Sequence, residues 1–359
     1  MTTRTQDKRT FLTALTTVAT VTAVAAAGML AMAPAFAQTV ELKVSHYLPP
    51  NHTINVELKR WADDLASKSG GRLKLTVFPA GQMGPITRQF DLARTGVADL
   101  SFFLHGATPG RFPMTDIAQV PFAFNPDGST PQPALSAAES SAILTGLTGQ
   151  LAKEYEGTRV LYMVAQPNIG LFFNKAVVRK PADMKGMRLR HNGPMPAKMI
   201  EAWGATPAAV APVELADALE KGTVNGMTFN FEAAQSFQLA GAVKSVTDID
   251  AYAVTFALVM NEKKYESLPA DLRKLIDDST GVDGARRVGA RYDAAEEAGR
   301  SYMLANKVEV IVLSAEEQAA MRAPLKPLVD QTIEAAQGKG LPARKFFDDL
   351  RARVNAAKR

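Results

Sequence analysis

Strands and helices alternate along almost the whole chain, and this alternation restricts the possible folds more than any other feature. Residues 40–48, VELKVSHYL, alternate apolar and polar side chains, as a strand with one buried face does. Residues 54–65 then repeat apolar side chains at helical spacing, up to a break at Gly70 and Gly71. The order continues with a strand at 72–78, a helix at 86–96, a strand at 97–103 and a helix around 134–154. This pattern predicts βαβ units around a parallel sheet, and so an α/β protein.

The alternation starts again in the middle of the chain, which predicts a second α/β unit. Strands are expected at 158–164, 187–190, 206–211 and 224–230, with helices at 196–203 and 213–222. YAVTFALVMN, residues 252–261, is a further apolar strand, and strong helix formers fill 269–306 apart from a break at 279–281. Ser314 and Glu317 form a capping box that begins one of the C-terminal helices.

The N-terminus has the three parts of a secretory leader. Three basic residues within the first ten precede an uncharged run at 11–33, which leads to an A-x-A cleavage site at 35–37. This predicts export to the periplasm with cleavage after Ala37; a retained membrane anchor is the alternative. KRTFL, residues 8–12, is similar to a twin-arginine signal with lysine in the first arginine position, so both the Sec and the Tat routes stay open.

Composition excludes several classes of function for the mature chain. Removing 37 of the 359 residues leaves 322, enough for two domains, and no further run of 18 apolar residues follows. The chain has no cysteine, which excludes disulfides, a lipid-anchored cysteine and thiolate metal sites. The whole chain carries a net charge of +5 and the leader contributes +2, leaving about +3. This weak, scattered charge gives no indication of nucleic-acid binding.

Catalytic and cofactor motifs are missing from the sequence. There is no G-x-S-x-G, no H-E-x-x-H and no P-loop. GKGLPA at 338–343 resembles a dinucleotide fingerprint but joins two predicted helices instead of following a strand. His46 and His52 flank a Pro-Pro turn without a metal-ligand spacing, and Asp248 with Asp250 is typical of a turn. We therefore expect no catalytic residue, no metal and no cofactor.

Two arginines end a predicted strand at residues 181–194, PADMKGMRLRHNGP. In open α/β sheets, ligands bind beyond the carboxyl ends of the strands, and Arg190 is the last residue before the turn. A guanidinium group binds a carboxylate in bidentate fashion, which lysine cannot do. Arg190 is therefore a candidate anion clamp. The alternative, a solvated sheet face, applies to Arg188 as well.

Five segments, in order along nearly the whole mature chain, resemble one known family. They are LKVSHYLPPNHTINVELKRWADDLASKSGGRLKLTVFPAGQMG, RTGVADLSF, KPADMKGMRLR, GATPAAVAPVELADALEKGTVNGMTF and LVMNEKKYESLPADLRKLI. The sequence is similar to the C4-dicarboxylate-binding type of extracytoplasmic receptor, which serves tripartite ATP-independent periplasmic (TRAP) transporters.

The resemblance implies a two-domain periplasmic binding protein fold, with a ligand cleft between the domains and a long helix that spans both. The expected boundaries are 38–167 with 256–295 for domain I, and 168–255 with 296–359 for domain II. In the family, the arginine that ends the strand after P-x-D-x-K-G binds the ligand carboxylate. That position corresponds to Arg190 here, and Arg188 keeps the structural interpretation.

The resemblance also implies further ligand contacts, at positions that match the family pattern less closely than Arg190 does. Tyr47 ends the first strand, and Phe103 and His105 follow GVADL, in the stretch that lines the cleft in the family. Core packing for Phe103 and a surface loop for His105 are equally open. Asn192 follows the arginine, and Phe229 and Asn230 follow NGMT, which completes the set of expected ligand contacts.

Departures from the family pattern bear on the ligand. Some members have a second arginine where this chain has Ile169, and a D-G-x-x-N motif where it has Asn225 and Phe229. A second carboxylate on the ligand is therefore not expected, and a monocarboxylate with a moderately apolar or aromatic body fits better.

These observations favour a periplasmic receptor that binds a small organic acid and delivers it to the membrane subunits of a TRAP permease. Closure of the two domains around the ligand is the expected mechanism. A binding protein for an ATP-driven importer or a sensor, and a periplasmic enzyme acting on an organic acid, are the alternatives.

The first testable expectation concerns the leader. The mature protein is expected to begin at Gln38, because Ala35-Phe36-Ala37 follows the uncharged run. N-terminal sequencing of protein recovered from the periplasm measures this directly. Material that begins at Met1 would contradict the predicted cleavage and the compartment derived from it.

Overall fold

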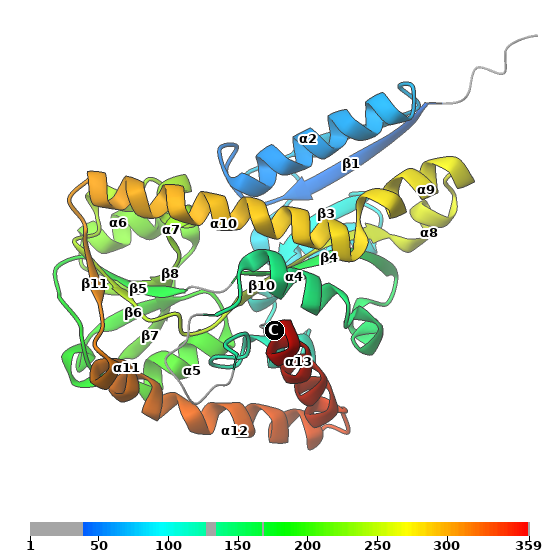
Figure 1. Ribbon diagram of the computed structural model, residues 1–359. Helices are drawn as coiled ribbons and strands as arrows, with labels where there is room; N and C mark the ends of the chain where they lie inside the picture. The colour runs from blue at the N-terminus through cyan, green and yellow to red at the C-terminus, as the bar shows by residue number, and fades with distance from the viewer. Residues whose placement is uncertain (1–38, 127–133, 167–168, 358–359) are drawn as a thin grey trace, which may run out of the picture. The chain divides into compact units, whose positions relative to one another are not determined.

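The computed structural model describes residues 39–126, 134–166 and 169–357, which form two β-sheets flanked by helices (Figure 1). The predicted leader lies outside the described residues. Within these ranges the first sheet has five strands in the order β2-β1-β3-β10-β4: β1 Val40–His46, β2 Leu73–Phe78, β3 Leu100–Leu104, β4 Thr158–Gln166 and β10 Val254–Asn261. The second sheet, in the same ranges, has six in the order β11-β9-β5-β8-β6-β7: β5 Gly170–Phe173, β6 Arg188–His191, β7 Thr206–Ala209, β8 Gly226–Phe229, β9 Ser245–Asp248 and β11 Glu309–Val312. We call the elements around these sheets the first and the second lobe.

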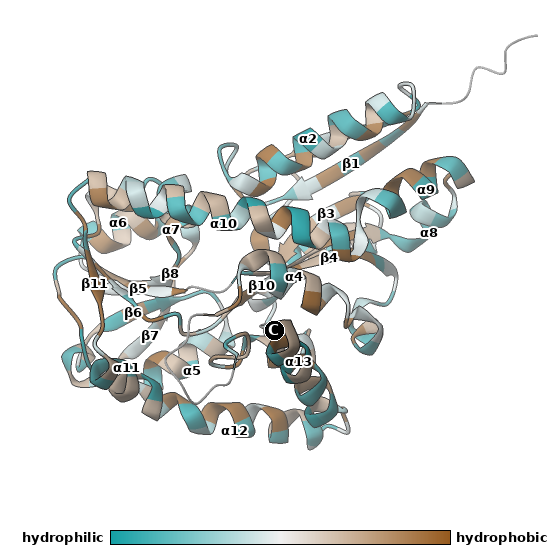
Figure 2. Cartoon of the chain, viewed as in Figure 1, coloured by the Kyte–Doolittle hydropathy of each residue, from teal (hydrophilic) through white to brown (hydrophobic). Residues whose placement is uncertain are grey.

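Amphipathic helices cover both sheets. The first lobe carries α2 Thr53–Lys68, α3 Gln89–Arg94, α4 Ala137–Thr145, α8 Glu262–Glu266 and α9 Ala270–Ser279. The second carries α5 Pro194–Ala202, α6 Leu215–Glu220, α7 Phe231–Ser236 and α11 Ala315–Arg322; α10 Gly281–Ala305, α12 Lys326–Gln337 and α13 Ala343–Ala357 complete the set. In α2, Ile54, Leu58, Trp61 and Leu65 are buried, as their spacing predicts. Apolar colour marks β1 and β11, whereas β6 is hydrophilic (Figure 2). No helix in the described part of the chain has both the length and the apolar character that a membrane crossing requires.

The sheets are mixed, whereas the alternation of strands and helices predicts parallel ones. β10 runs antiparallel to β3 and β4, and β5 runs antiparallel to β8 and β9. Both strands follow a connection from the other lobe instead of a crossover helix on their own sheet, so no βαβ unit sets their direction. The sequence also missed the four-residue strands β5 and β9, and overestimated the helix at 134–154, of which α4 spans only Ala137–Thr145.

The chain passes between the lobes from β4 to β5, from β9 to β10, along the long helix α10, which runs past both sheets (Figure 1), and through α12, which leads from α11 to α13. The C-terminal helix α13 packs against α4 and against the 3-10 turn Thr115–Gln119, both in the first lobe. The predicted domain boundaries, 38–167 with 256–295 and 168–255 with 296–359, stay a prediction.

Two glycines allow α10 to approach each lobe closely. A Cβ atom at Gly289 would collide with the backbone of Ala137 at the start of α4. A Cβ atom at Gly299 would collide with the backbone of Phe231 at the start of α7. Since the colliding atoms are backbone, no side-chain rotation relieves the contact. The two positions therefore fix how α10 is seated on the two lobes.

We expect Gly289→Ala and Gly299→Ala each to lower the free energy of unfolding by about 1–3 kcal/mol, because overpacking exceeds the gain in helix propensity. Denaturant titration measures the change. Gly149→Ala is the matched control, since a Cβ there meets nothing within 4 Å. Equal stability of all three variants would contradict the seating of α10.

Candidate ligand-binding site

A cavity lies between the lobes, at the carboxyl ends of parallel strands from both sheets. Leu104 ends β3 beside Tyr47, which follows β1, and in the second sheet the cavity is lined by Arg190 of β6 and Phe229 of β8. The cavity holds about 460 Å³ of atom-free space, counted with the solvent at its mouth. Its apolar lining comprises Leu104, Ile169, Phe229, Phe237, Val254 and Phe256. This lining suits a small organic ligand.

Arg190 is the cationic group of the cavity, and its side chain is only 3% exposed. Its Nε donates a hydrogen bond to the Val210 carbonyl, 3.1 Å away, and its guanidinium carbon lies 5.4 Å from the centre of the Phe229 ring. Nη1 is buried without a hydrogen-bond partner, and no described carboxylate forms an ion pair with this side chain. One face of the guanidinium group is thus fixed by the protein while a donor stays unused.

Burial lowers the pKa of Arg190 to about 10, and the nearby Tyr252 and Tyr47 act in the opposite direction. The group therefore stays protonated at neutral pH. A buried charge without a counter-charge is unfavourable, so an anion that reaches Nη1 is stabilised. Arg188 contrasts with it: its side chain is exposed, and its backbone N–H donates to Asn225 Oδ1 at 2.8 Å.

Asn192 lines the cavity next to Arg190, and Tyr252 orients its amide. The Tyr252 hydroxyl donates to Asn192 Oδ1 at 2.8 Å and lies 3.3 Å from Thr228 Oγ1. With Oδ1 engaged, the NH₂ group of Asn192 is the part available to a ligand. Sequence reasoning missed Tyr252, although its hydroxyl at the start of the apolar segment 252–261 was a usable signal.

Tyr47 lines the cavity from the first lobe, and His46 shapes the backbone around it. His46 Nδ1 accepts the Leu48 N–H at 3.2 Å, and its Nε2 lies 3.1 Å from Asn55 Oδ1. Burial lowers the pKa of His46 to about 4, so the ring is neutral and acts as a fixed brace. Burial also raises the pKa of Tyr47, which keeps its hydroxyl protonated and able to donate.

Phe103 and His105 are not among the residues that line the cavity. Along β3 successive side chains point to opposite faces, so Leu104 faces the cavity and Phe103 faces away. Phe103 packs 4.9 Å from the His105 ring within an aromatic cluster, where His105 Nε2 lies 2.6 Å from the Tyr155 hydroxyl. Burial lowers the pKa of His105 to about 3, so this histidine is a neutral core residue. The structure thus favours core packing for Phe103, and the burial of His105 does not fit the surface loop that was its alternative. The ligand contacts predicted for these two residues stay a prediction.

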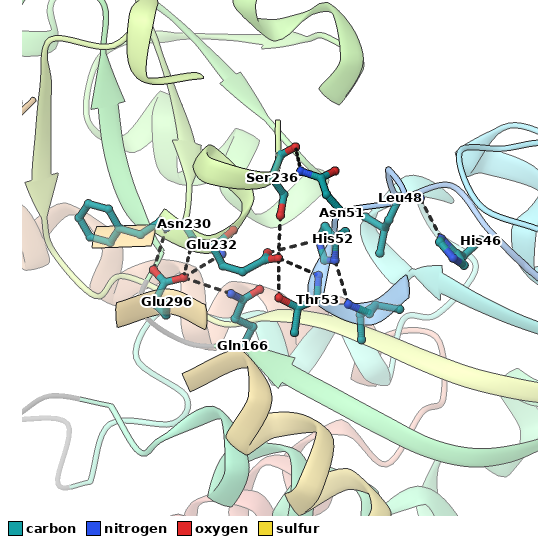
Figure 3. Close-up of polar contacts among 12 residues, drawn as sticks. His46, Leu48, Asn51, His52, Thr53, Gln166, Asn230, Glu232, Ser236 and Glu296 are labelled. Atoms are coloured by element: carbon teal, nitrogen blue, oxygen red, sulfur yellow. Dashed lines mark hydrogen bonds and ion pairs between the residues drawn. The ribbon is translucent and has the colours of Figure 1, made fainter. Parts of the chain in front are cut away.

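Asn230 lines the cavity, but its amide is already used. Its Nδ2 donates to Glu296 Oε2 at 2.9 Å, and the same carboxylate accepts the N–H groups of Phe231 and Glu232 at 2.8 and 2.9 Å (Figure 3). Burial raises the pKa of Glu296 to about 7, against the lowering effect of these hydrogen bonds. Glu296 belongs to α10, so the long helix holds the start of α7 at the cavity.

The lobes touch on two sides of the cavity. On one side, Glu232 of α7 accepts hydrogen bonds from the N–H and hydroxyl of Thr53 at the start of α2, at 3.2 and 2.9 Å (Figure 3). On the other side, the backbones of Gly106 and Gly193 meet: a Cβ at Gly193 would lie 2.8 Å from the Gly106 Cα. Contacts between residues far apart in the sequence therefore join the two lobes.

Two further observations limit the charge in the cavity. Ile169, where some relatives carry a second arginine, lines the cavity with its apolar side chain. Arg111 does not line it; its guanidinium group stacks 4.9 Å from the Phe90 ring and lies 3.8 Å from Asp91. In the described ranges no cluster of three metal-ligating side chains was found.

Comparison with known proteins decides the family. Residues 44–335 match the family described as "Bacterial extracellular solute-binding protein, family 7". The chain belongs to this family. Its members are periplasmic solute receptors, so the predicted recognition and fold class are confirmed, and the chain is a receptor of the TRAP type.

Sequence relatives support the assignment at low identity. The chain is 24% identical to the outer membrane transporter protein TsaT of Comamonas testosteroni over 315 residues, which is 86% of this chain and 89% of that protein. It is 22% identical to the 2,3-diketo-L-gulonate-binding periplasmic protein YiaO of Escherichia coli over 262 residues, 72% of this chain and 77% of that protein.

Solved structures are similar over almost their whole length. A marine-metagenome TRAP solute-binding protein specific for aromatic acids, solved with 3-hydroxybenzoate, has a TM-score of 0.83 and 28% identity, covering 89% of this chain and 99% of that one. A TRAP protein from Rhodoferax ferrireducens with copurified benzoate has a TM-score of 0.81 and 27% identity, covering 88% and 98%. Receptors of this fold bind small organic acids, and the predicted receptor function is confirmed at that level.

The two arginines of β6 are expected to differ sharply in ligand binding. Arg190→Ala should weaken binding of the copurifying ligand by roughly 30- to several-thousand-fold, since breaking a buried charge pair costs about 2–5 kcal/mol. Arg188→Ala, the matched control, should weaken it less than about fivefold, and Arg190→Lys should restore binding only in part. Calorimetry on variants shown to be folded by circular dichroism provides the measurement. Equal affinity of the two alanine variants would contradict the assignment of Arg190 as the residue that binds the ligand carboxylate.

Proposed function

We propose that the protein binds a monocarboxylate with a flat, apolar or aromatic body in the cavity between the lobes, and passes it to the membrane permease of a TRAP transporter. The observation that carries this proposal is the unused Nη1 donor of Arg190, which is buried at the wall of a cavity with a largely aromatic and aliphatic lining. A carboxylate at Nη1 supplies the missing counter-charge. Asn192 and Tyr47 lie at the same cavity and supply further donors.

The rest of the cavity favours an apolar body for the ligand. Phe229, Phe237 and Phe256 offer aromatic surface at the cavity. Similar structures at 26–28% identity were solved with benzoate, 3-hydroxybenzoate and mandelate. These ligands join one carboxylate to one aromatic ring, which is the combination that Arg190 and the phenylalanines suit.

Contact between the lobes supports a closing mechanism for delivery. The lobes are in contact through Thr53 with Glu232 and through Gly106 with Gly193. Separating these pairs opens the cavity without unfolding either lobe. A permease that recognises the closed arrangement then receives loaded receptors. Export to the periplasm with cleavage after Ala37 is part of the same proposal.

The ligand itself can be identified by gentle denaturation of the purified protein and mass spectrometry of the released small molecules. A thermal-shift screen of mono- and dicarboxylates then ranks candidates, because ligand at 100 times its dissociation constant adds about 2.7 kcal/mol of stability. Recovery of only sugars, cations or neutral compounds would contradict the proposal.

A second carboxylate on the ligand is expected to weaken binding. Isophthalate should bind at least tenfold less tightly than benzoate, since the cavity has Ile169 in place of a second arginine and contains the Glu232 carboxylate. Isothermal titration calorimetry with the two acids measures the ratio. A preference for the diacid of tenfold or more would show that an additional cation reaches the cavity.

A further inference from the structure

Two buried polar atoms without a hydrogen-bond partner belong to side chains of the same cavity, and they have opposite character. Arg190 Nη1 is a donor and Glu232 Oε2 is an acceptor, and neither has a hydrogen-bond partner among the described residues. Glu232 is only 2% exposed. His52 Nε2 approaches Oε2 to 3.3 Å, but it does so outside hydrogen-bonding geometry. Such unpaired buried atoms are rare in folded proteins and mark places where a missing partner binds.

The other oxygen of Glu232 is fully occupied, which fixes the orientation of the carboxylate. Oε1 accepts the N–H of Thr53 at 3.2 Å, the Thr53 hydroxyl at 2.9 Å and the Ser236 hydroxyl at 3.0 Å (Figure 3). A backbone N–H only donates, so Oε1 acts as an acceptor. Tilting the carboxylate out of this plane would break these three hydrogen bonds. Oε2 is thus held as a pre-oriented acceptor at the cavity.

We propose that Glu232 Oε2 accepts a hydrogen bond from a hydroxyl group of the ligand, so that the preferred ligand is a hydroxylated aromatic monocarboxylate. This inference rests on the proposed function, in which the carboxylate of the ligand lies on Arg190. The two charged side chains orient the ligand: its carboxylate is attracted by Arg190 and repelled by Glu232. Its donor group is placed at the opposite end.

Hydroxyl recognition by a desolvated carboxylate produces strong selectivity. A ligand without the hydroxyl leaves Oε2 stripped of water and unpaired, and a hydrogen bond to a charged group then accounts for about a tenfold to hundredfold difference in affinity. Glu232 belongs to the second lobe, whereas Thr53, which fixes it, belongs to the first. The acceptor is therefore fully positioned only while the lobes are in contact, and the hydroxyl slows ligand dissociation more than it speeds association.

A ligand series on the unmodified protein is the first test, with affinities measured by calorimetry. At least one of 3-hydroxybenzoate and 4-hydroxybenzoate should bind tenfold or more tightly than benzoate. The corresponding methoxybenzoate should lose this advantage, because it keeps the oxygen but has no proton to donate. Stopped-flow kinetics should assign most of the difference to the dissociation rate.

Glu232→Gln is the second test, since it keeps the shape of the side chain and removes its charge. The hydroxybenzoate preference should fall below about threefold, and isophthalate should gain affinity relative to benzoate. Glu297→Gln is the matched control: it removes the same charge from an exposed position on α10 and should leave both ratios unchanged. Ratios between ligands are compared within each variant, so a general loss of affinity does not imitate the effect.

The outcomes separate the inference from the proposed function. Tight benzoate binding with no gain from either hydroxyl, or a full hydroxyl preference retained in Glu232→Gln, overturns the role of Glu232 alone. Failure of every aromatic acid to bind overturns the proposed ligand class and the inference with it. If Glu232→Gln does not fold, the hydroxyl and methoxy pair on the unmodified protein still decides.

Discussion

The buried guanidinium group of Arg190 is the interaction on which the rest of the site depends. The second lobe holds it by one hydrogen bond and one aromatic face, yet none of the described acids neutralises it. A protein that encloses a cation without a counter-charge carries an electrostatic cost in its empty, closed arrangement. A bound carboxylate removes that cost, so ligand binding and lobe contact favour each other. In the proposed function, the same group provides both affinity for the ligand and a reason for the receptor to close.

The short helix α7 connects the long helix α10 to the cavity, so the position of α10 determines where α7 lies. Glu296 of α10 accepts the first N–H groups of α7. Glu232, the second residue of α7, accepts hydrogen bonds from Thr53 at the start of α2. The Glu296 carboxylate therefore links α10 to α7, and the Glu232 carboxylate links α7 to α2. Gly299 allows α10 to lie against this corner without an intervening side chain. The placement of the acceptor in the cavity consequently depends on packing at some distance from any ligand.

Much of the fold could be predicted from sequence, because periodicity and strand ends are local properties. Arg190 was predicted because it ends a predicted strand, and Tyr47 was predicted from the family resemblance. Phe103 was chosen from a fully buried strand, where burial does not reveal which face a side chain occupies, and the structure places it one residue out of phase with the cavity. Glu232 was missed, since its partner Thr53 lies 179 positions away and only the folded chain brings them together.

The contact between Gly106 and Gly193 allows the receptor to select ligands by size. Their backbones meet directly, so the distance between the lobes at that edge is set by main-chain atoms and does not adapt to the ligand. An acid too bulky for the cavity has to hold these glycines apart. The receptor then stays partly open even though Arg190 has a carboxylate bound. A membrane partner that binds only receptors in which Gly106 and Gly193 are in contact would exclude such a ligand without touching it.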